Sequence, residues 1–325
     1  MPQQTNLNVS PYFDDYSDDS GYHKVLFKPG YPVQARELNN LQSILQNQIE
    51  KFGQHFFKEG AKVIPGNTGY NKLYYNIQLQ NTFQGVPVSA YVDQLVGTQI
   101  TGRTSGVTAV VDNVLSAEDS ERGNLTLYVA YIGSSTSNNA TQTFADGEEL
   151  TSNVPISSGL LGNSSISSGS PFAVTIAQNA AATGSCFQIQ EGVYFIRGQF
   201  VKVEQQTLIL EQYNNQANYR VGLAVNEEII NSDMDETLND NSQGFNNYSA
   251  PGADRLKITL SLFKKPLDDF DDNAFVEEAE VVEGVLKSKV KTSAYKGLSD
   301  ELARRTYDES GNYYVKPFSV TTRDS

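Results

Sequence analysis

The residues of this chain that best suit chemistry are a run of acidic side chains, Asp268, Asp269, Asp271 and Asp272, followed by Asn273. Carboxylate and amide oxygens are the ligands that Ca²⁺ prefers in proteins. The run lacks the glycine and the terminal glutamate that an EF-hand loop needs at fixed positions. The sequence therefore favours a solvated acidic turn over a calcium site, and we predict no metal-binding residue.

Motifs for catalysis are missing. The only two histidines, His23 and His55, do not lie in a pattern that positions a nucleophile or a metal. No P-loop, dinucleotide fingerprint, His-Glu-x-x-His or paired-cysteine motif occurs. A carboxylate pair can hydrolyse glycosides, but the chain has no tryptophan to line a sugar-binding cleft. We predict no catalytic residue, no cofactor and no enzymatic activity, with a polysaccharide depolymerase as the least favoured alternative.

One long amphipathic helix, predicted over residues 34–57, is the clearest element of the chain. Its apolar side chains recur three or four residues apart and form one stripe. They are Leu38, Leu41, Leu45, Ile49, Phe52 and Phe56. The opposite face carries amides and charges. The stripe either packs on the rest of its own domain or forms a seam with copies of itself, and Gln48 and His55 interrupt the heptad pattern that a seam requires.

An extended arm is predicted before this helix, over residues 1–33, because aspartates, prolines and glycines dominate it. Such a segment needs a partner surface to become ordered. Its aromatic residues Tyr12, Phe13 and Tyr16, together with the six residues of the helix stripe, are our candidate interface residues.

Composition limits the classes of partner. Against 38 acidic residues stand 24 basic ones, and the net charge of −14 repels phosphate backbones, so we predict no nucleic-acid partner. No stretch approaches the ~18 apolar residues that a membrane span needs, and the N-terminus has no pattern of an export signal. We therefore expect a soluble protein without a membrane span.

Beyond the arm, the chain reads as mostly strand and loop. The fold class we predict is mainly β with one long N-terminal α-helix, α+β and multidomain, with a small inserted β-barrel or β-sandwich. A docking domain of helix plus β-hairpin is expected to combine residues 34–83 and 183–218. An all-β domain, residues 84–182, is inserted in it, and a β-rich C-terminal domain, residues 219–325, follows and possibly continues in a longer protein. Two similar segments, residues 59–66 and 191–198, each read as a short strand closed by a glycine turn.

Three segments resemble the virion structural proteins of tailed bacteriophages, in particular tail and baseplate components of cyanophages with contractile tails. They are residues 22–38 (YHKVLFKPGYPVQAREL) running into 41–46, residues 248–256 (YSAPGADRL) and residues 302–318 (LARRTYDESGNYYVKPF). Together these segments bracket most of the chain. The inserted domain resembles the Gly, Ser and Thr-rich modules that decorate such proteins.

The resemblance implies a non-enzymatic structural component of the virion, in the tail or baseplate, that mediates the attachment of neighbouring tail or fibre proteins. The implied partners are those proteins and further copies of the chain itself, as a homo-oligomer for which a trimer is the preferred guess. The implied location is the virion tail or baseplate, after synthesis in the host cytoplasm. An alternative is a tail adhesin that binds a host surface glycan through loops 133–140 and 157–170.

Overall fold

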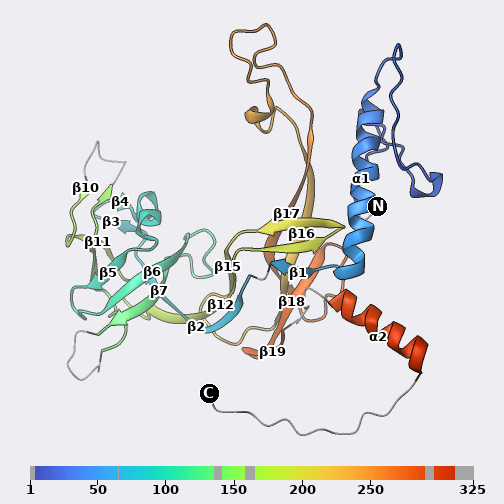
Figure 1. The fold of residues 1–325 in the computed structure, drawn as a ribbon. Helices are drawn as coiled ribbons and strands as arrows, with labels where there is room; N and C mark the ends of the chain where they lie inside the picture. The colour runs from blue at the N-terminus through green and yellow to red at the C-terminus, as the bar shows by residue number, and fades with distance from the viewer. Residues whose placement is uncertain (1–3, 65, 135–140, 158–164, 290–295, 312–325) are drawn as a thin grey trace, which may run out of the picture.

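The computed structural model describes residues 4–64, 66–134, 141–157, 165–289 and 296–311. The described chain is mainly β and contains two α-helices, α1 (Ala35–Phe56) and α2 (Lys296–Ser310). This confirms the predicted mainly β, α+β class. In Figure 1, a strand-rich lobe stands on the left, the remaining sheets occupy the centre, and α1 stands on the right, beside the N-terminal arm.

The left lobe is a six-stranded barrel. Its strands, in ring order, are β2 (Thr68–Leu79), β7 (Leu125–Gly133), β6 (Thr108–Leu115), β5 (Gln99–Gly102), β8 (Glu149–Ser152) and β11 (Pro171–Val174). The ring closes between its first and last strands, because the Gln80 N–H donates to the Val174 carbonyl at 2.9 Å and Leu79 pairs with Thr175. The predicted choice between barrel and sandwich is thus resolved as a barrel, which includes the end of β2.

The barrel encloses a core of its own. Its fully buried members all come from the region between Ile77 and Ala180, and the largest of them include Leu95, Leu127 and Phe172. Short elements close its ends: β3 (Thr82–Phe83), β4 (Val86–Pro87), β9 (Ile156–Ser157), β10 (Ser165–Ile166), η2 (Val88–Ala90) and η3 (Val92–Leu95). Apolar side chains point inward on alternating strand positions, so the barrel buries its hydrophobic residues in its own core.

Two strands connect the barrel to the centre of the molecule. The long strand β2 pairs with β12 (Ala181–Ile189) from Thr68↔Ile189 to Ile77↔Ala181, so the chain enters and leaves the barrel through neighbouring strands. On its other side, β12 pairs with β15 (Gln206–Glu211). The only cysteine, Cys186, is fully buried in β12.

The centre contains two further sheets. The first has the order β1 (Ala61–Ile64), β13 (Gly192–Ile196), β14 (Gln199–Val203), and the second has the order β17 (Arg255–Pro266), β16 (Tyr219–Ile230), β18 (Phe275–Val282), β19 (Val285–Lys289). The two similar segments of the sequence are direct partners, because β1 and β13 pair antiparallel with Lys62 opposite Tyr194.

A second core joins these sheets. It includes Phe187 from β12, Tyr194 from β13, Leu223 from β16 and Val281 from β18. Residues 183–218 and 219–325 were predicted to form separate domains, and the structure differs in that their described strands share this core. The remaining elements are η1 (Asp18–Ser20) in the arm and η4 (Glu236–Leu238) in the loop that projects between β16 and β17 in Figure 1.

Candidate docking surface on the long helix

Local interactions set the two ends of α1. At its start, the Glu37 carboxylate accepts a hydrogen bond from the Gln34 backbone N–H at 2.9 Å, which stabilises the first turn. Near its end, Gly53 faces Phe195 of β13, and a Cβ built on Gly53 would stand 2.5 Å from the Phe195 ring. Gly53 therefore lets the helix approach the sheet closely.

The face of α1 that is buried in its own chain is the polar one. Its buried residues are Ser43, Ile44, Asn47, Glu50 and Gly53. The expectation that the apolar stripe would pack on its own domain is therefore wrong. Most buried polar groups have hydrogen-bond partners, so we expect hydrogen-bonding groups to cover this face.

The N-terminal arm supplies those groups by running along the polar face. The contacts from helix to arm are Asn39 Nδ2 to Tyr12 O (3.0 Å), Asn40 Nδ2 to Asp14 Oδ1 (3.2 Å), Ser43 Oγ to Asp14 Oδ2, Asn47 Nδ2 to the Tyr16 hydroxyl (2.8 Å) and Lys51 Nζ to Asp18 Oδ1 (2.7 Å). The partner surface that the arm needs is thus the helix that follows it.

The described start of the arm is anchored on a buried ion pair. Arg197 and Glu227 form a salt bridge of 2.5 Å, and their side chains are only 8% and 4% exposed. The same Glu227 carboxylate accepts the backbone N–H of Thr5 at 2.9 Å and that of Gln4 at 3.1 Å. Burial opposes ionisation of Glu227, yet the hydrogen bonds from Arg197 and Thr5 outweigh it and hold the pKa of this carboxyl below its usual value.

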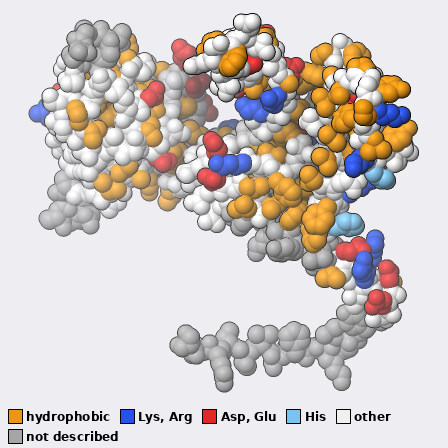
Figure 2. All heavy atoms as spheres, turned by 45° about the horizontal axis from the view of Figure 1, so that its top comes forward, with side chains coloured by type: hydrophobic (Ala, Val, Ile, Leu, Met, Phe, Trp, Pro, Cys, Tyr) orange, Lys and Arg blue, Asp and Glu red, His pale blue; other side chains and the backbone are white. Residues whose placement is uncertain are grey.

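The apolar stripe faces away from this contact. Leu38 and Ile49 are about half exposed, Leu45 is 57% exposed and Phe52 is 66% exposed, while Leu41 and Phe56 are partly buried. Figure 2 shows hydrophobic side chains gathered on the part of the surface at the right, where Figure 1 places α1 and the arm. We call these six residues the α1 stripe. Isolated exposed apolar residues are common, but several of them in one row along a helix form a candidate interaction surface.

The three candidate residues of the arm differ in their exposure. The Tyr12 hydroxyl donates to Asp254 Oδ2 at 2.5 Å, and the Tyr16 hydroxyl accepts from Asn47. Both rings are therefore committed to contacts within the chain. Phe13 is 54% exposed. Of the three arm candidates, only Phe13 has a side chain that is largely exposed.

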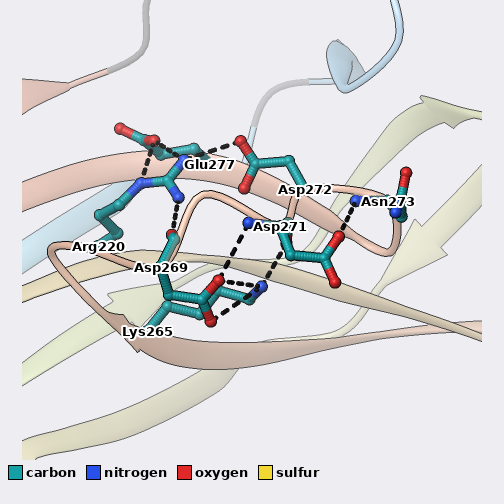
Figure 3. A network of polar contacts seen from close by, with 7 residues as sticks. All are labelled: Arg220, Lys265, Asp269, Asp271, Asp272, Asn273 and Glu277. Atoms are coloured by element: carbon teal, nitrogen blue, oxygen red, sulfur yellow. Dashed lines mark hydrogen bonds and ion pairs between the residues drawn. The ribbon is translucent and has the colours of Figure 1, made fainter.

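The acidic run at residues 268–273 folds into a turn that binds two cationic side chains (Figure 3). Arg220 Nη2 lies 2.9 Å from Asp272 Oδ2 and 2.6 Å from Glu277 Oε2, while Lys265 Nζ lies 3.4 Å from Asp269 Oδ2. The turn is thus not simply solvated. Among the described residues, no group of three His, Cys, Asp or Glu side chains is arranged to hold a metal ion.

Two carboxyl groups at the C-terminal end of α1 have shifted pKa values. Burial raises the pKa of Glu50, and burial likewise raises the pKa of Glu59, which accepts the Arg197 N–H at 2.7 Å. Glu50 Oε1 accepts from Gln54 at 3.0 Å, but its buried Oε2 has no hydrogen-bond partner among the residues that the structure describes. Folding therefore disfavours the ionised form of Glu50, near the C-terminal end of α1.

Sequence reasoning missed the residues that hold the arm in place. Ser43, Asn47 and Glu227 carry no motif, and the arm contacts become visible only when segments far apart in sequence are brought together. The sole sequence signal was the unusual number of asparagines on the polar face of the helix. The loops proposed to bind a glycan fall mostly outside the described residues, namely at 135–140 and 158–164.

In the part of the chain that the structure describes, no helix has both the length and the apolar character needed to cross a lipid bilayer. Comparisons with curated proteins and with solved structures gave no match. A family model described as a domain of unknown function, DUF4815, matches residues 10–82 and 142–325. The unmatched residues 83–141 contain β5, β6 and β7, three of the barrel strands. Because the matched segments cover well over half of the sequence, including α1 and most of the arm, the chain belongs to the DUF4815 family.

Proposed function

We propose that this protein is a non-enzymatic structural component of a tailed-phage virion, in the tail or baseplate, and that α1 is the surface through which it assembles. The observation that carries this proposal is the reversed orientation of α1. Its polar face is buried against the arm and the central sheets, and its apolar stripe is exposed to solvent.

The reversed orientation of α1 gives up hydrophobic stabilisation in a protein that works alone. Burying apolar area contributes about 25 cal/mol per Å², and a helix normally gains this by turning its apolar face inward. Here hydrogen bonds from Asn40, Ser43 and Asn47 to the arm hold the polar face inward instead. The arrangement leaves the hydrophobic gain to be made on binding a partner, as expected for an assembly subunit.

The resemblance of residues 22–38, 248–256 and 302–318 to virion structural proteins supports the location. The first of these segments runs from the arm into α1, so the likeness includes part of the surface that we propose for docking. Neighbouring tail or fibre proteins are the proposed partners, together with further copies of the chain.

The test is the composition of particles purified from the phage that encodes this chain. Mass spectrometry should detect its peptides at a constant ratio to the other tail proteins, and labelled antibodies should mark the tail or baseplate in electron micrographs. A protein of the same infection that is not packaged serves as the control. Presence in the infected lysate without presence in the particles would refute the proposal.

The adhesin and depolymerase alternatives are tested with the full chain. We expect it neither to bind host cells or lipopolysaccharide nor to release sugars from host polysaccharide. Binding that is lost when loops 133–140 and 157–170 are shortened would support the adhesin. Sugar release that is lost on changing an acidic pair to amides would support the enzyme.

A further inference from the structure

A cleft lies between α1, the arm and the start of β17. Its volume is about 590 Å³, which is in the range of sites that hold small ligands or side chains. The arm contributes Tyr12 and Asp14 to the lining, α1 contributes Asn39 and Gln46 among others, and Asp254 precedes β17. Most of the lining residues are polar, so the cleft suits a polar ligand.

Two carboxylates of this cleft have no cationic partner in the described part of the chain. The first, Asp14, is only 6% exposed, and it accepts hydrogen bonds from the uncharged side chains of Asn40 and Ser43. The second, Asp254, accepts the hydroxyl of Tyr12 at 2.5 Å. Buried charges are costly unless they are paired, so these carboxylates favour a ligand with positive charge.

Arg255 lines the same cleft but does not neutralise it. Its Nη1 donates to the main-chain carbonyls of Ala253 at 2.7 Å and Asp254 at 3.2 Å. Within the described residues, Arg255 forms no ion pair with either carboxylate. Because two carboxylates outnumber one guanidinium group, the lining keeps a net negative charge that disfavours an anionic ligand.

Two side-chain amides add hydrogen-bond acceptors on the side of α1. Asn39 Nδ2 donates to the Tyr12 carbonyl at 3.0 Å, and Gln46 Nε2 donates to the Gly198 carbonyl at 3.2 Å. The side-chain carbonyl oxygens of these two amides have no partner among the residues that the structure describes. A ligand that fits the cleft therefore needs several N–H donors as well as positive charge.

A guanidinium group meets both requirements. It is planar, always charged and carries five N–H donors in a fixed fork, whereas a lysine ammonium group places three donors at a single point. Tyr12, which lines the cleft, supplies an aromatic ring of the kind on which guanidinium groups stack. The described residues contain no group of three side chains arranged for a metal ion, so an organic cation is the better match.

We propose that the cleft between α1, the arm and β17 receives the arginine side chain of a neighbouring tail or fibre protein. The preference for a guanidinium group follows from the residues of the cleft itself. That the arginine belongs to a tail or fibre protein rests on the proposed function. The inference adds a polar contact, with a stated chemistry, to the apolar contact proposed for the α1 stripe.

The first experiment titrates the isotopically labelled full chain with the blocked peptide acetyl-Gly-Arg-Gly-amide. The side-chain amide signals of Asn39 and Gln46, followed by NMR, should shift in a saturable way. The same peptide with citrulline, which has a similar shape but no charge, should bind about tenfold more weakly, because hydrogen bonds to charged groups are stronger. Equal binding of the two peptides, or no saturable shift up to the solubility limit, overturns the inference.

Two variants test whether the arginine peptide binds in this cleft. Asp254→Asn keeps an acceptor for Tyr12 but removes one charge, and it should weaken binding about tenfold. Asp268→Asn makes the same change on an exposed side chain outside the cleft and should alter binding by less than ~twofold. Circular dichroism verifies that both variants are folded. Equal affinities of the two variants would show a general attraction to the acidic chain and would overturn the inference.

The second experiment identifies the source of the arginine by placing a photo-reactive amino acid at Gln42, an exposed residue of the cleft. In particles, it should link to an arginine-containing segment of a tail or fibre protein, and Asp254→Asn should abolish the link. A packaged chain that links to no such segment refutes this inference and leaves the proposed function standing. A chain that binds the peptide but is absent from particles refutes the proposed function and leaves only the guanidinium site.

Discussion

The barrel and α1 distribute their apolar side chains in opposite ways. The barrel buries residues such as Leu127 and Phe172 completely, and its ring of strands closes on itself. α1 buries Ser43 and Asn47 and exposes Phe52. The barrel therefore buries its apolar side chains in a core of its own, whereas hydrogen bonds hold α1 with its polar face inward. The same chain thus contains one region that is stabilised by apolar burial and one whose orientation is set by hydrogen bonds.

The sharpest way to break this comparison is to truncate one phenylalanine in each region. Phe172→Ala should lower the free energy of unfolding by about 3–5 kcal/mol, because it leaves a cavity in the barrel core. Phe52→Ala should change the stability of the dilute chain by no more than ~0.5 kcal/mol, because the ring is mostly in solvent. Urea unfolding followed by circular dichroism measures both. Equal losses would show that the α1 stripe is packed within its own chain.

The next effect comes from the buried ion pair that anchors the arm. Arg197→Met should destabilise the protein by about 3 kcal/mol, because it leaves the Glu227 carboxylate buried without its cation. Lys202→Met is the matched control, since Lys202 pairs with Glu191 on the surface, where both side chains are more than half exposed. Its effect should stay below ~1 kcal/mol in the same urea titration. A similar loss of unfolding free energy in both variants would show that burial does not determine how much an ion pair contributes to stability.

Acid should release the start of the arm. The pKa of Glu227 is lowered in the folded chain, so its contribution to stability is present above the unfolded pKa of about 4.3 and is lost as pH falls through the folded value. Amide protection factors at Gln4 and Thr5, from hydrogen exchange, should therefore fall on acidification below about pH 4. Glu227→Gln should lower them at neutral pH already. Protection that persists in this variant would exclude the carboxylate as the anchor.

Near the C-terminal end of α1, Glu50 is expected to change the stability of the chain with pH in the opposite direction and by a smaller amount. The pKa of Glu50 is raised, so the stability that its protonated form supports is present below the unfolded pKa and is lost as pH rises through the folded value. Glu50→Gln should stabilise the chain by about 1 kcal/mol at pH 7, where a buried oxygen of the native carboxylate has no hydrogen-bond partner in the described part of the chain. Thermal unfolding at pH 4 and pH 7 gives the comparison. A less stable variant at pH 7 would indicate a partner for this oxygen.

The smallest expected effect is that of calcium. The carboxylates of the turn at residues 268–273 are engaged by Arg220 and Lys265, so added Ca²⁺ should leave the melting temperature unchanged. A rise that Asp272→Asn abolishes would show instead that the turn exchanges Arg220 for the ion. That result would make the turn a calcium site.

The helix and the strands were predictable because apolar periodicity is a local signal. A helix was predicted over residues 34–57, and the structure places it at Ala35–Phe56. The two segments predicted as short strands, residues 59–66 and 191–198, contain β1 and β13. Apolar periodicity does not show which face of a helix is buried when another segment of the chain can form hydrogen bonds with the polar side chains of that helix. The inward face of α1 depends on Asp14 and Tyr16, and the acidic turn depends on Arg220, about fifty residues earlier in the chain. Such partners are selected by tertiary structure.

The paired strands that lead into and out of the barrel make it an exchangeable cassette. Ile77 and Ala181 are direct partners in the β2–β12 ladder, so a short turn between these two strands could replace everything beyond them without stretching the central sheets. The surface of α1, at the far side of the molecule in Figure 1, would be unchanged by such a replacement. Evolution could therefore vary the barrel while the rest of the fold stays the same.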